Sequence, residues 1–193
     1  MGVLSQKLFP IVEAMQKHFS TKDKYEYSVV PKLWGRIVQL DVDLKYRSNI
    51  RELFLEFDRF PSGVVIGIAR EMQPVYRHTF WQYRKENPQS RVGEPPADGL
   101  PGFNSGVMLL DLGNVSLLAD QYHFRGYLGD QDFFTMISME HPGLIHSLAC
   151  GWNRQLCTWW REHGYGDVFQ LYYHCDGPVY IYHGNCNTPI PDD

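Results

Sequence analysis

Continuous apolar runs, rather than alternating ones, mark the strands that this chain is expected to form. Such runs are typical of strands covered on both faces, as in a parallel sheet between helices. The segment 34–43 carries Ile37, Val38 and Leu40 and then stops at two carboxylates. Four further apolar segments predict strands at residues 63–69, 102–112, 144–148 and 179–183.

Helical segments are expected between these strands. Asn49 followed by Glu52 is typical of a helix N-cap with its reciprocal partner. Acidic residues open the segment 130–140, where they complement the dipole of a second helix. Residues 87–102 hold four prolines and three glycines and are expected to form a long surface loop. Strands alternating with helices predict an α/β fold, with a mostly parallel sheet and helices on both faces.

Composition narrows the class of protein. The chain has 193 residues, enough for one domain with a substantial core, and 44% of them are hydrophobic. The formal net charge is −4 with no long basic block, so no nucleic acid partner is expected. No apolar run has the length of a membrane span and no signal peptide opens the chain, so we expect no membrane span in this chain.

The acidic pair after the first predicted strand is the leading candidate for chemistry. Asp41 and Asp43 are separated by Val42, and side chains two apart in an extended chain point the same way. Both carboxylates therefore converge at the carboxyl end of a buried strand, where ligands of open α/β sheets usually bind. Hard oxygen ligands suit Mg²⁺ or Mn²⁺, which often share substrate phosphates. The alternative is an exposed strand end whose carboxylates only keep the chain soluble.

Three further polar clusters accompany the acidic pair. They are Asn104-Ser105 between Gly102 and Gly106, Asp130-Gln131-Asp132 after Gly129, and His183 before Gly184. Taken alone, they also fit an ordinary tight turn, a polar helix start and a structural histidine. Because a neutral imidazole can complete a metal site that has two carboxylates, we predict that Asp41, Asp43 and His183 form a three-ligand set for Mn²⁺.

The cysteines indicate an oxidising compartment. All four lie in the last quarter of the chain, at positions 150, 157, 175 and 186. An even, clustered set predicts two disulfides. Zinc is the alternative, but the chain has no C-x₂-C pair.

The order of the motifs DVDLKY, FNSGVMLLDL, GDQDFF and YHGNCN resembles glycosyltransferase family 8, a family of retaining enzymes with the GT-A fold. Longer segments are similar to the xylosyltransferase branch of that family: IRELFLEFDRF, GIAREMQPVYRHTFWQYRKENP, PGFNSGVMLLDL, FRGYLGDQDFFTM and WNRQLCTWWREHGY. The resemblance extends from about residue 34 to residue 193. It implies a Rossmann-like GT-A domain over residues 1–193.

The resemblance also implies an activity. The branch transfers xylose from UDP-xylose, in α-1,3 linkage, to the xylose of an O-linked xylose–glucose disaccharide on EGF repeats of Notch-type proteins. Its members work in the lumen of the endoplasmic reticulum and are membrane-anchored at full length. Asp41, Asp43 and His183 would then hold Mn²⁺, or Mg²⁺, against the donor diphosphate.

Individual roles follow from the same resemblance. The residues expected to bind the donor are Asp41, Val42, Asp43, Asn104, Ser105, Asp130, Gln131, His183, Gly184 and Asn185. Gln131 would lie near the anomeric carbon, with Asp132 lining the same pocket, so these two are the candidate catalytic residues. Retention requires either a carboxylate nucleophile on the far face or a front-face substitution, and the sequence leaves both open. The candidate acceptor-side aromatics are Trp81, Trp159 and Trp160.

Among the three possible pairings of the cysteines we predict Cys150–Cys175 and Cys157–Cys186. The chain also departs from the family pattern. The first nucleotide-binding strand has no counterpart in residues 1–33, and the segment 112–128 looks shortened, near residues 113–121. The His motif continues as HGNCNTP, without the lysine that family members use to neutralise the diphosphate. An alternative hypothesis is therefore a truncated, catalytically impaired remnant that acts at most as a binding protein. A metal-dependent phosphohydrolase is disfavoured because such enzymes usually gather more acidic ligands.

Overall fold

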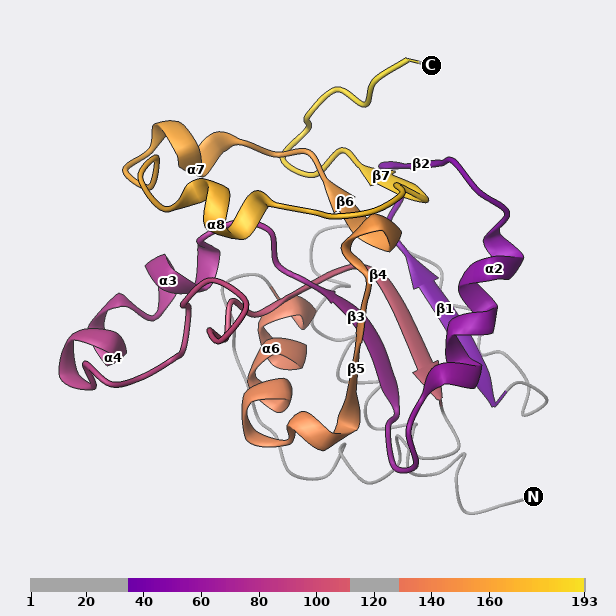
Figure 1. The fold of residues 1–193 in the computed structure, drawn as a ribbon, viewed down its shortest axis with the longest axis horizontal. Helices are drawn as coiled ribbons and strands as arrows, with labels where there is room; N and C mark the ends of the chain where they lie inside the picture. The colour runs from indigo at the N-terminus through magenta and orange to yellow at the C-terminus, as the bar shows by residue number, and fades with distance from the viewer. Residues whose placement is uncertain (1–34, 112–128, 193) are drawn as a thin grey trace, which may run out of the picture.

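The fold is built on a mixed four-stranded sheet, seen in a computed structural model that describes residues 35–111 and 129–192 (Figure 1). Its strands are β1 (Arg36–Leu40), β3 (Ile66–Arg70), β4 (Phe103–Asp111) and β5 (Ile145–Leu148). Their order in the sheet is β1-β4-β3-β5. All four lie within or close to segments that the apolar runs predict. The expected first nucleotide-binding strand and the expected shortening near 113–121 lie outside the described residues.

Strand direction differs from the expectation. β4 lies antiparallel to both of its neighbours, β1 and β3, and only β3 and β5 pair in parallel. Among the described strands the sheet is therefore mixed rather than mostly parallel. The physical reason is that a continuous apolar run indicates a strand whose two faces are both buried. Such a strand has the same sequence pattern whether its neighbours are parallel or antiparallel.

Helices cover both faces of this sheet, as the α/β class predicts (Figure 1). On one face, Leu53 of α2 (Ile50–Leu55) and Phe57 of η1 (Glu56–Arg59) pack in one cluster with Val107 and Leu109. On the other face, Phe134 of α6 (Asp130–Glu140) packs against the cluster containing Met108 and Ile68. Successive residues of β4 thus face opposite layers, because side chains alternate along a strand.

Local sequence explains where the two covering helices begin. The Asn49 side chain accepts a hydrogen bond from the backbone N–H of Arg51, which caps α2 as predicted. Helix α6 begins at Asp130, directly after Gly129, whose φ of 70° is a conformation that glycine adopts without strain. Both predicted helices are therefore present, and α6 has the predicted bounds 130–140.

A second, three-stranded sheet has the order β2-β7-β6. Its strands are β2 (Leu44–Tyr46), β6 (Arg154–Gln155) and β7 (Ile181–His183). β7 pairs antiparallel with β2 and parallel with β6. Residues 41–43 connect β1 of the first sheet to β2 of the second, so the acidic pair lies between the two sheets.

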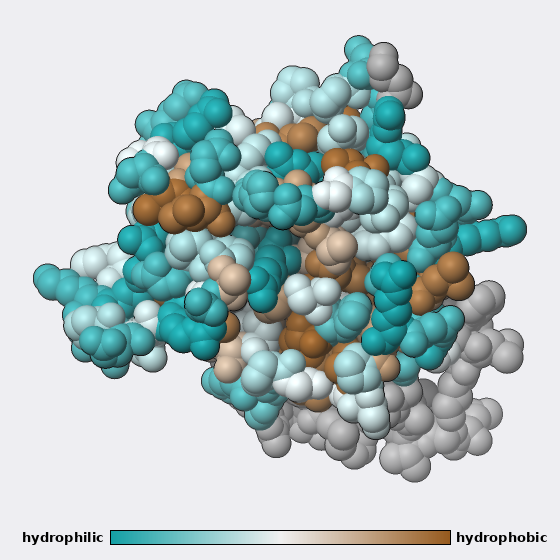
Figure 2. All heavy atoms as spheres, in the orientation of Figure 1, coloured by the Kyte–Doolittle hydropathy of each residue, from teal (hydrophilic) through white to brown (hydrophobic). Residues whose placement is uncertain are grey.

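Short helices complete the described part of the chain: α3 (Val75–Thr79), α4 (Trp81–Glu86), η2 (Pro142–Leu144), η3 (Cys150–Asn153), α7 (Trp159–Glu162) and α8 (Phe169–Tyr173). The predicted loop 87–102 contains no helix or strand. It is held at Gly93, whose carbonyl accepts a 2.6 Å hydrogen bond from the Tyr172 hydroxyl of α8. Figure 2 shows separate hydrophobic patches over α8 and α2, where Leu171 is 56% and Leu55 62% exposed. No helix in the described ranges has the length and apolarity needed to cross a bilayer.

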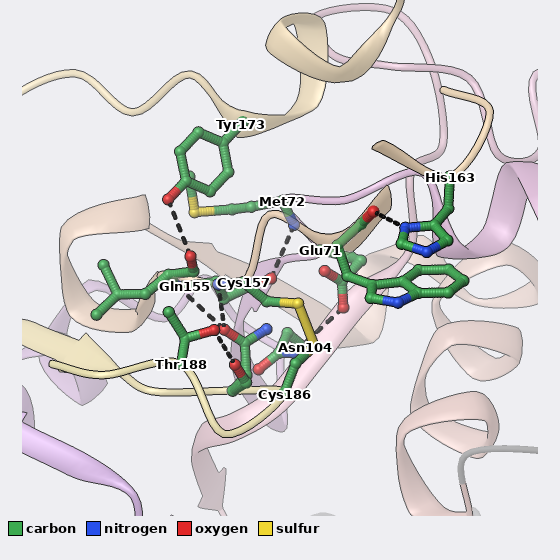
Figure 3. Close-up of a disulfide and its surroundings, with 12 residues drawn as sticks. Glu71, Met72, Asn104, Gln155, Cys157, His163, Tyr173, Cys186 and Thr188 are labelled. Atoms are coloured by element: carbon green, nitrogen blue, oxygen red, sulfur yellow. Dashed lines mark hydrogen bonds between the residues drawn. A yellow bond between two sulfur atoms is a disulfide. The ribbon is translucent and has the colours of Figure 1, made fainter. Parts of the chain in front are cut away.

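Two disulfides join the C-terminal segments, Cys150–Cys175 and Cys157–Cys186. Both predicted pairs are thereby confirmed. The second bridge ties the segment after β6 to the turn after β7, and its surroundings include Glu71 and Asn104 (Figure 3).

Candidate active site

The acidic pair and the late histidine meet at one point. The Nε2 atom of His183 lies 3.6 Å from Oδ2 of Asp41 and 3.4 Å from Oδ1 of Asp43. One potential ligand atom from each of the three residues lies within 4.8 Å of the other two. The carboxylates are about half exposed, whereas the imidazole is buried. The predicted three-residue cluster therefore exists as a geometric fact.

Backbone hydrogen bonds set this geometry. The N–H of Asp41 donates to the carbonyl of Gly106 on β4 at 3.0 Å, so Asp41 continues the pairing of the first sheet. The N–H of Gly184 donates to the carbonyl of Asp43 at 2.9 Å, and Leu44 pairs with His183 in the second sheet. Register in the two sheets thus brings together side chains about 140 residues apart in the sequence.

The electrostatics of the cluster favour a cation. Burial raises the pKa of Asp41, and the neighbouring Asp43 adds to the rise, while His183 opposes it. Burial lowers the pKa of His183, although Asp43 and Asp41 oppose that change. A neutral imidazole beside two carboxylates leaves negative charge that a divalent ion would neutralise.

The donor set fits Mn²⁺ or Mg²⁺. Nδ1 of His183 lies 2.9 Å from Oδ1 of Asn153, an oxygen that can only accept. A neutral imidazole that donates from Nδ1 to this oxygen carries its proton there and turns the lone pair of Nε2 toward the carboxylates. Two carboxylate oxygens and one imidazole nitrogen form the kind of open set that such ions complete with other oxygen ligands.

Asn104 holds the floor of the site from β4. Its Oδ1 accepts from the N–H of Gly106 at 3.1 Å and from Nδ2 of Asn153 at 2.8 Å, and its Nδ2 donates to Oε2 of Glu71 at 3.1 Å. Both polar atoms of its side chain are thus hydrogen-bonded to protein groups. The expectation that Asn104 binds donor hydroxyls remains a prediction.

Glu71 is a buried carboxylate that two predicted site residues share. Oε2 of Glu71 accepts from Asn104 and also from Nε2 of Gln131 at 3.1 Å, and the Gln131 carbonyl accepts from the N–H of Ser105 at 3.3 Å. Burial raises the pKa of Glu71 to about 7, while the hydrogen bonds from Asn104 and Gln131 lower it. The amide of Gln131 is therefore held at both ends.

The neighbours of Gln131 have different environments. Asp130 lies 3.5 Å from Nε2 of Gln39, and burial raises its pKa, with the nearby Asp41 carboxylate adding to the rise. Asp132 is buried, and its Oδ1 accepts a 2.9 Å hydrogen bond from the hydroxyl of Tyr76. Asp130 is thus electrostatically coupled to Asp41 of the three-residue cluster, whereas Asp132 is hydrogen-bonded to a tyrosine of α3.

The remaining predicted donor-binding residues contribute in other ways. The side chain of Val42 is fully exposed between the two carboxylates. A side chain on Gly184 would come within 2.8 Å of the Thr188 carbonyl, so this position requires glycine. The Asn185 oxygen accepts from the N–H groups of Leu156 and Cys157, both at 3.0 Å, and so fastens the turn after β7. Asn185 therefore supports the turn that follows His183.

The three predicted acceptor-side tryptophans lie on α4 and α7. Trp81 is 59% exposed and Trp159 is 51% exposed. Trp159 stacks on His163 with a centroid distance of 3.6 Å. Trp160 contacts Trp159 edge-on, with a centroid distance of 4.9 Å. The exposed parts of Trp81 and Trp159 are accessible to a ligand, but a role in acceptor binding remains a prediction.

Two residues of the site, Glu71 and Asn153, were not found by reasoning from the sequence. Glu71 directly follows strand β3, as Asp41 follows β1, so the rule that polar groups gather at strand ends could have found it. Asn153 lies at the end of η3, and no pattern in its neighbourhood marks it.

Comparisons with known proteins place the chain among glycosyltransferases. No protein-family model matches it. The chain is 63% identical to mouse (Mus musculus) Xyloside xylosyltransferase 1 and 62% identical to the human (Homo sapiens) protein, in each case over 220 residues covering the whole chain. It is also 30% identical over 141 residues to mouse Xylosyl- and glucuronyltransferase LARGE2, over 67% of this chain and 19% of that protein.

A solved structure shows the same fold. The crystal structure of mouse Xyloside xylosyltransferase 1, apo form, matches with a TM-score of 0.79 and 59% identity, over 98% of this chain and 74% of that one. The match confirms the predicted α/β glycosyltransferase class. The chain spans 56% of the length of the mouse and human relatives. The alignments cover 220 positions, 27 more than the 193 residues of this chain, so the relatives hold at least 27 aligned residues without a counterpart here.

Proposed function

Since this chain belongs to the xyloside xylosyltransferase family, we propose that it is a retaining, Mn²⁺-dependent transferase that uses UDP-xylose. The acceptor we propose is the xylose of an O-linked xylose–glucose disaccharide on EGF repeats of Notch-type proteins, extended in α-1,3 linkage. The single observation that carries the proposal is the convergence of Asp41, Asp43 and the lone pair of His183.

The ligand cluster has the chemistry that a nucleotide-sugar donor requires. Asp41, Asp43 and His183 would hold the divalent ion, which when bound acts as a Lewis acid on the departing diphosphate. Mn²⁺ is our choice, and Mg²⁺ is the alternative with the same ligand preferences. The chain has no lysine in the HGNCNTP motif, so charge on the diphosphate would be neutralised mainly at this cluster.

The environment of Gln131 supports a front-face substitution. Gln131 is held by Glu71 and by the N–H of Ser105, and an amide is a poor nucleophile. Asp132, the alternative nucleophile, already accepts from Tyr76. In the proposed step the bond from the anomeric carbon to the phosphate oxygen breaks, and the acceptor oxygen bonds to that carbon on the same face. The acceptor hydroxyl proton passes to the leaving phosphate oxygen.

The acceptor side rests on the exposed aromatic surface of α4 and α7. Trp81 and Trp159 present half-exposed indoles, and amphipathic rings of this kind stack on sugars and on protein surfaces. The two disulfides support an oxidising compartment, and we propose the lumen of the endoplasmic reticulum.

A second candidate is a catalytically impaired form that at most binds a partner. The observation that favours it is the set of at least 27 aligned residues of the relatives that this chain lacks. If those residues complete the donor pocket, the chain would keep the metal cluster and lose affinity for the nucleotide.

One experiment separates the two. The protein is incubated with UDP-xylose, Mn²⁺ and a xylose–glucose acceptor on a folded EGF repeat, and the product is measured by mass spectrometry. The first proposal expects a trisaccharide that loses its terminal xylose to α-xylosidase, and it expects no trisaccharide from the Asp43→Asn variant. No trisaccharide, together with no thermal shift on adding UDP, would favour the impaired form.

A further inference from the structure

A line of buried side chains runs from His183 away from the acidic pair. Nδ1 of His183 meets Oδ1 of Asn153 at 2.9 Å, Nδ2 of Asn153 meets Oδ1 of Asn104 at 2.8 Å, and Nδ2 of Asn104 meets Oε2 of Glu71 at 3.1 Å. All four residues are at most 6% exposed. Because water does not reach these groups, each one depends on its protein partner.

Backbone groups fix the direction of every hydrogen bond in this line. The N–H of Gly106 donates to Oδ1 of Asn104, so the amide nitrogen of Asn104 must face Glu71. Nδ2 of Asn153 also lies 3.3 Å from the backbone carbonyl of Asn104, so Asn153 must turn its oxygen to His183. An imidazole facing an oxygen at Nδ1 carries its proton there.

Glu71 also fixes the orientation of the Gln131 amide. Its Oε2 accepts from both Asn104 and Gln131, and the N–H of Ser105 fixes the opposite end of the Gln131 amide. One carboxylate oxygen therefore orients a residue behind the metal cluster and a residue proposed to lie at the reacting carbon.

The ring of His183 is closely packed on the side that faces Gly106. A methyl group at Gly106 would lie 2.4 Å from Cε1 and 2.6 Å from Nδ1 of His183. The imidazole therefore packs on a bare backbone, and the hydrogen bond to Asn153 decides which nitrogen faces the carboxylates.

We propose that Asn153 and Glu71 are positioning residues: Asn153 holds His183 as the Nδ1-protonated tautomer with Nε2 open to a divalent cation, and Glu71 orients the Asn104 and Gln131 amides. The part that concerns xylosyl transfer rests on the proposed function. The part that concerns the tautomer and cation affinity stands on the hydrogen bonds alone.

The first test reads the tautomer directly in the metal-free protein. Long-range ¹H–¹⁵N spectra of the imidazoles are recorded for the wild type and for Asn153→Leu, Asn153→Asp and Asn87→Leu. We expect the Nδ1-protonated form in the wild type and in Asn153→Asp, which keeps an acceptor, and a shift toward Nε2 protonation in Asn153→Leu. Asn87 is exposed and donates to the Tyr83 carbonyl, so Asn87→Leu removes one amide hydrogen bond far from the site and should change nothing. An unchanged His183 signal in Asn153→Leu overturns the proposal.

The second test measures Mn²⁺ alone by electron paramagnetic resonance titration. Loss of the hydrogen-bond partner of a metal-binding histidine typically weakens metal affinity ~10–100-fold. We therefore expect Mn²⁺ affinity to fall ~10–100-fold in Asn153→Leu and at least ~10-fold in Glu71→Met. Glu71→Gln keeps an acceptor for Asn104 and Gln131 and should stay near the wild type. Equal affinity in Glu71→Met and Glu71→Gln overturns the role of Glu71, and it does so even if Asn153→Leu does not fold.

The outcomes for the two proposals are distinguishable. A wild type that binds Mn²⁺ and shows the expected tautomer, but transfers no xylose, refutes the proposed function and leaves the positioning role standing. A wild type that transfers xylose while His183 is protonated on Nε2 in the metal-free state refutes the positioning role alone.

Discussion

The imidazole of His183 lies directly against the α-carbon of Gly106, so close that a Cβ at position 106 would fall 2.4 Å from its Cε1 atom. Gly106 lies in β4 and His183 in β7, so this contact joins the two sheets. The sequence alone is compatible with Gly106 in an ordinary turn, but in the structure the ring of His183 packs directly against this glycine.

We expect Gly106→Ala to displace the His183 ring and to destabilise the fold by about 1–3 kcal/mol, as overpacking in a filled core typically does. Mn²⁺ affinity should fall at least ~10-fold, because the displaced ring no longer faces the carboxylates. Calorimetry and a Mn²⁺ titration measure both effects. Gly143→Ala is the matched control, since a Cβ there meets nothing within 4 Å. Full Mn²⁺ affinity in Gly106→Ala would contradict the packing argument.

Removal of the metal ligands should remove stabilisation by Mn²⁺. At a free Mn²⁺ concentration of about 100 times its dissociation constant, the ion should add about 2.7 kcal/mol to the free energy of unfolding, and EDTA should reverse the gain. Asp43→Asn and His183→Gln should unfold at the same temperature with and without Mn²⁺. Asp58→Asn, which changes an exposed carboxylate paired with Arg36, should respond like the wild type. A wild type whose melting temperature ignores Mn²⁺ would count against the cluster as a metal site.

The free energy of unfolding should depend on pH through Glu71. Its pKa is about 7 in the folded protein and 4.5 when unperturbed, so the folded state holds this proton more tightly than the unfolded chain. The contribution is therefore complete below pH 4.5 and is lost as pH rises toward 7, a change of about 3 kcal/mol at 1.36 kcal/mol per pKa unit. Urea unfolding from pH 4.5 to 8 should show that the stability of the wild type falls relative to Glu71→Gln over this range.

The exposed Glu52→Gln provides the comparison for that series, and its profile should run parallel to the wild type. If the stability of Glu71→Gln also changed with pH in parallel with the wild type, the carboxyl of Glu71 would have the same pKa in the folded and unfolded states. Its burial would then not affect the pH dependence of stability.

The two disulfides should differ in their effect on the site. They close loops with sequence separations of 25 and 29 residues, so each should stabilise the fold by about 3–4 kcal/mol in the chain-entropy model. Cys186 lies three residues after His183, in the turn after β7, whereas Cys150–Cys175 joins η3 to the segment after α8. Cys157→Ala/Cys186→Ala should therefore weaken Mn²⁺ affinity more than Cys150→Ala/Cys175→Ala, at similar losses of stability. Equal Mn²⁺ affinities in the two double variants would show that the turn holds its shape without its bridge.

Sequence patterns located the elements that carry the site but not all of its members. The apolar run before Asp41 and the motif YHGNCN around His183 predicted that Asp41, Asp43 and His183 lie together, as they do in the structure. Strand direction was not predictable, because cover on both faces produces the same apolar run for β4 as for a parallel strand. Asn153 was not predictable either, since its role depends on a contact with Asn104, 49 residues away in the sequence.

The surroundings of Asp132 were also not predictable from the sequence. Its role as a candidate catalytic residue stays a prediction, and the structure adds that its Oδ1 accepts a hydrogen bond from Tyr76 on α3. Adjacent residues at a helix start point in different directions, and which one faces the site depends on packing that a short motif does not contain.

The acidic pair lies on the segment that connects the two sheets. Asp41 is hydrogen-bonded to the first sheet through Gly106, whereas Asp43 and His183 are hydrogen-bonded to the second. An ion held by all three side chains would therefore link the two sheets. Loading and release of the cofactor should consequently appear as protection and deprotection of amide hydrogens along the seam at residues 41–43, well before any sugar is bound.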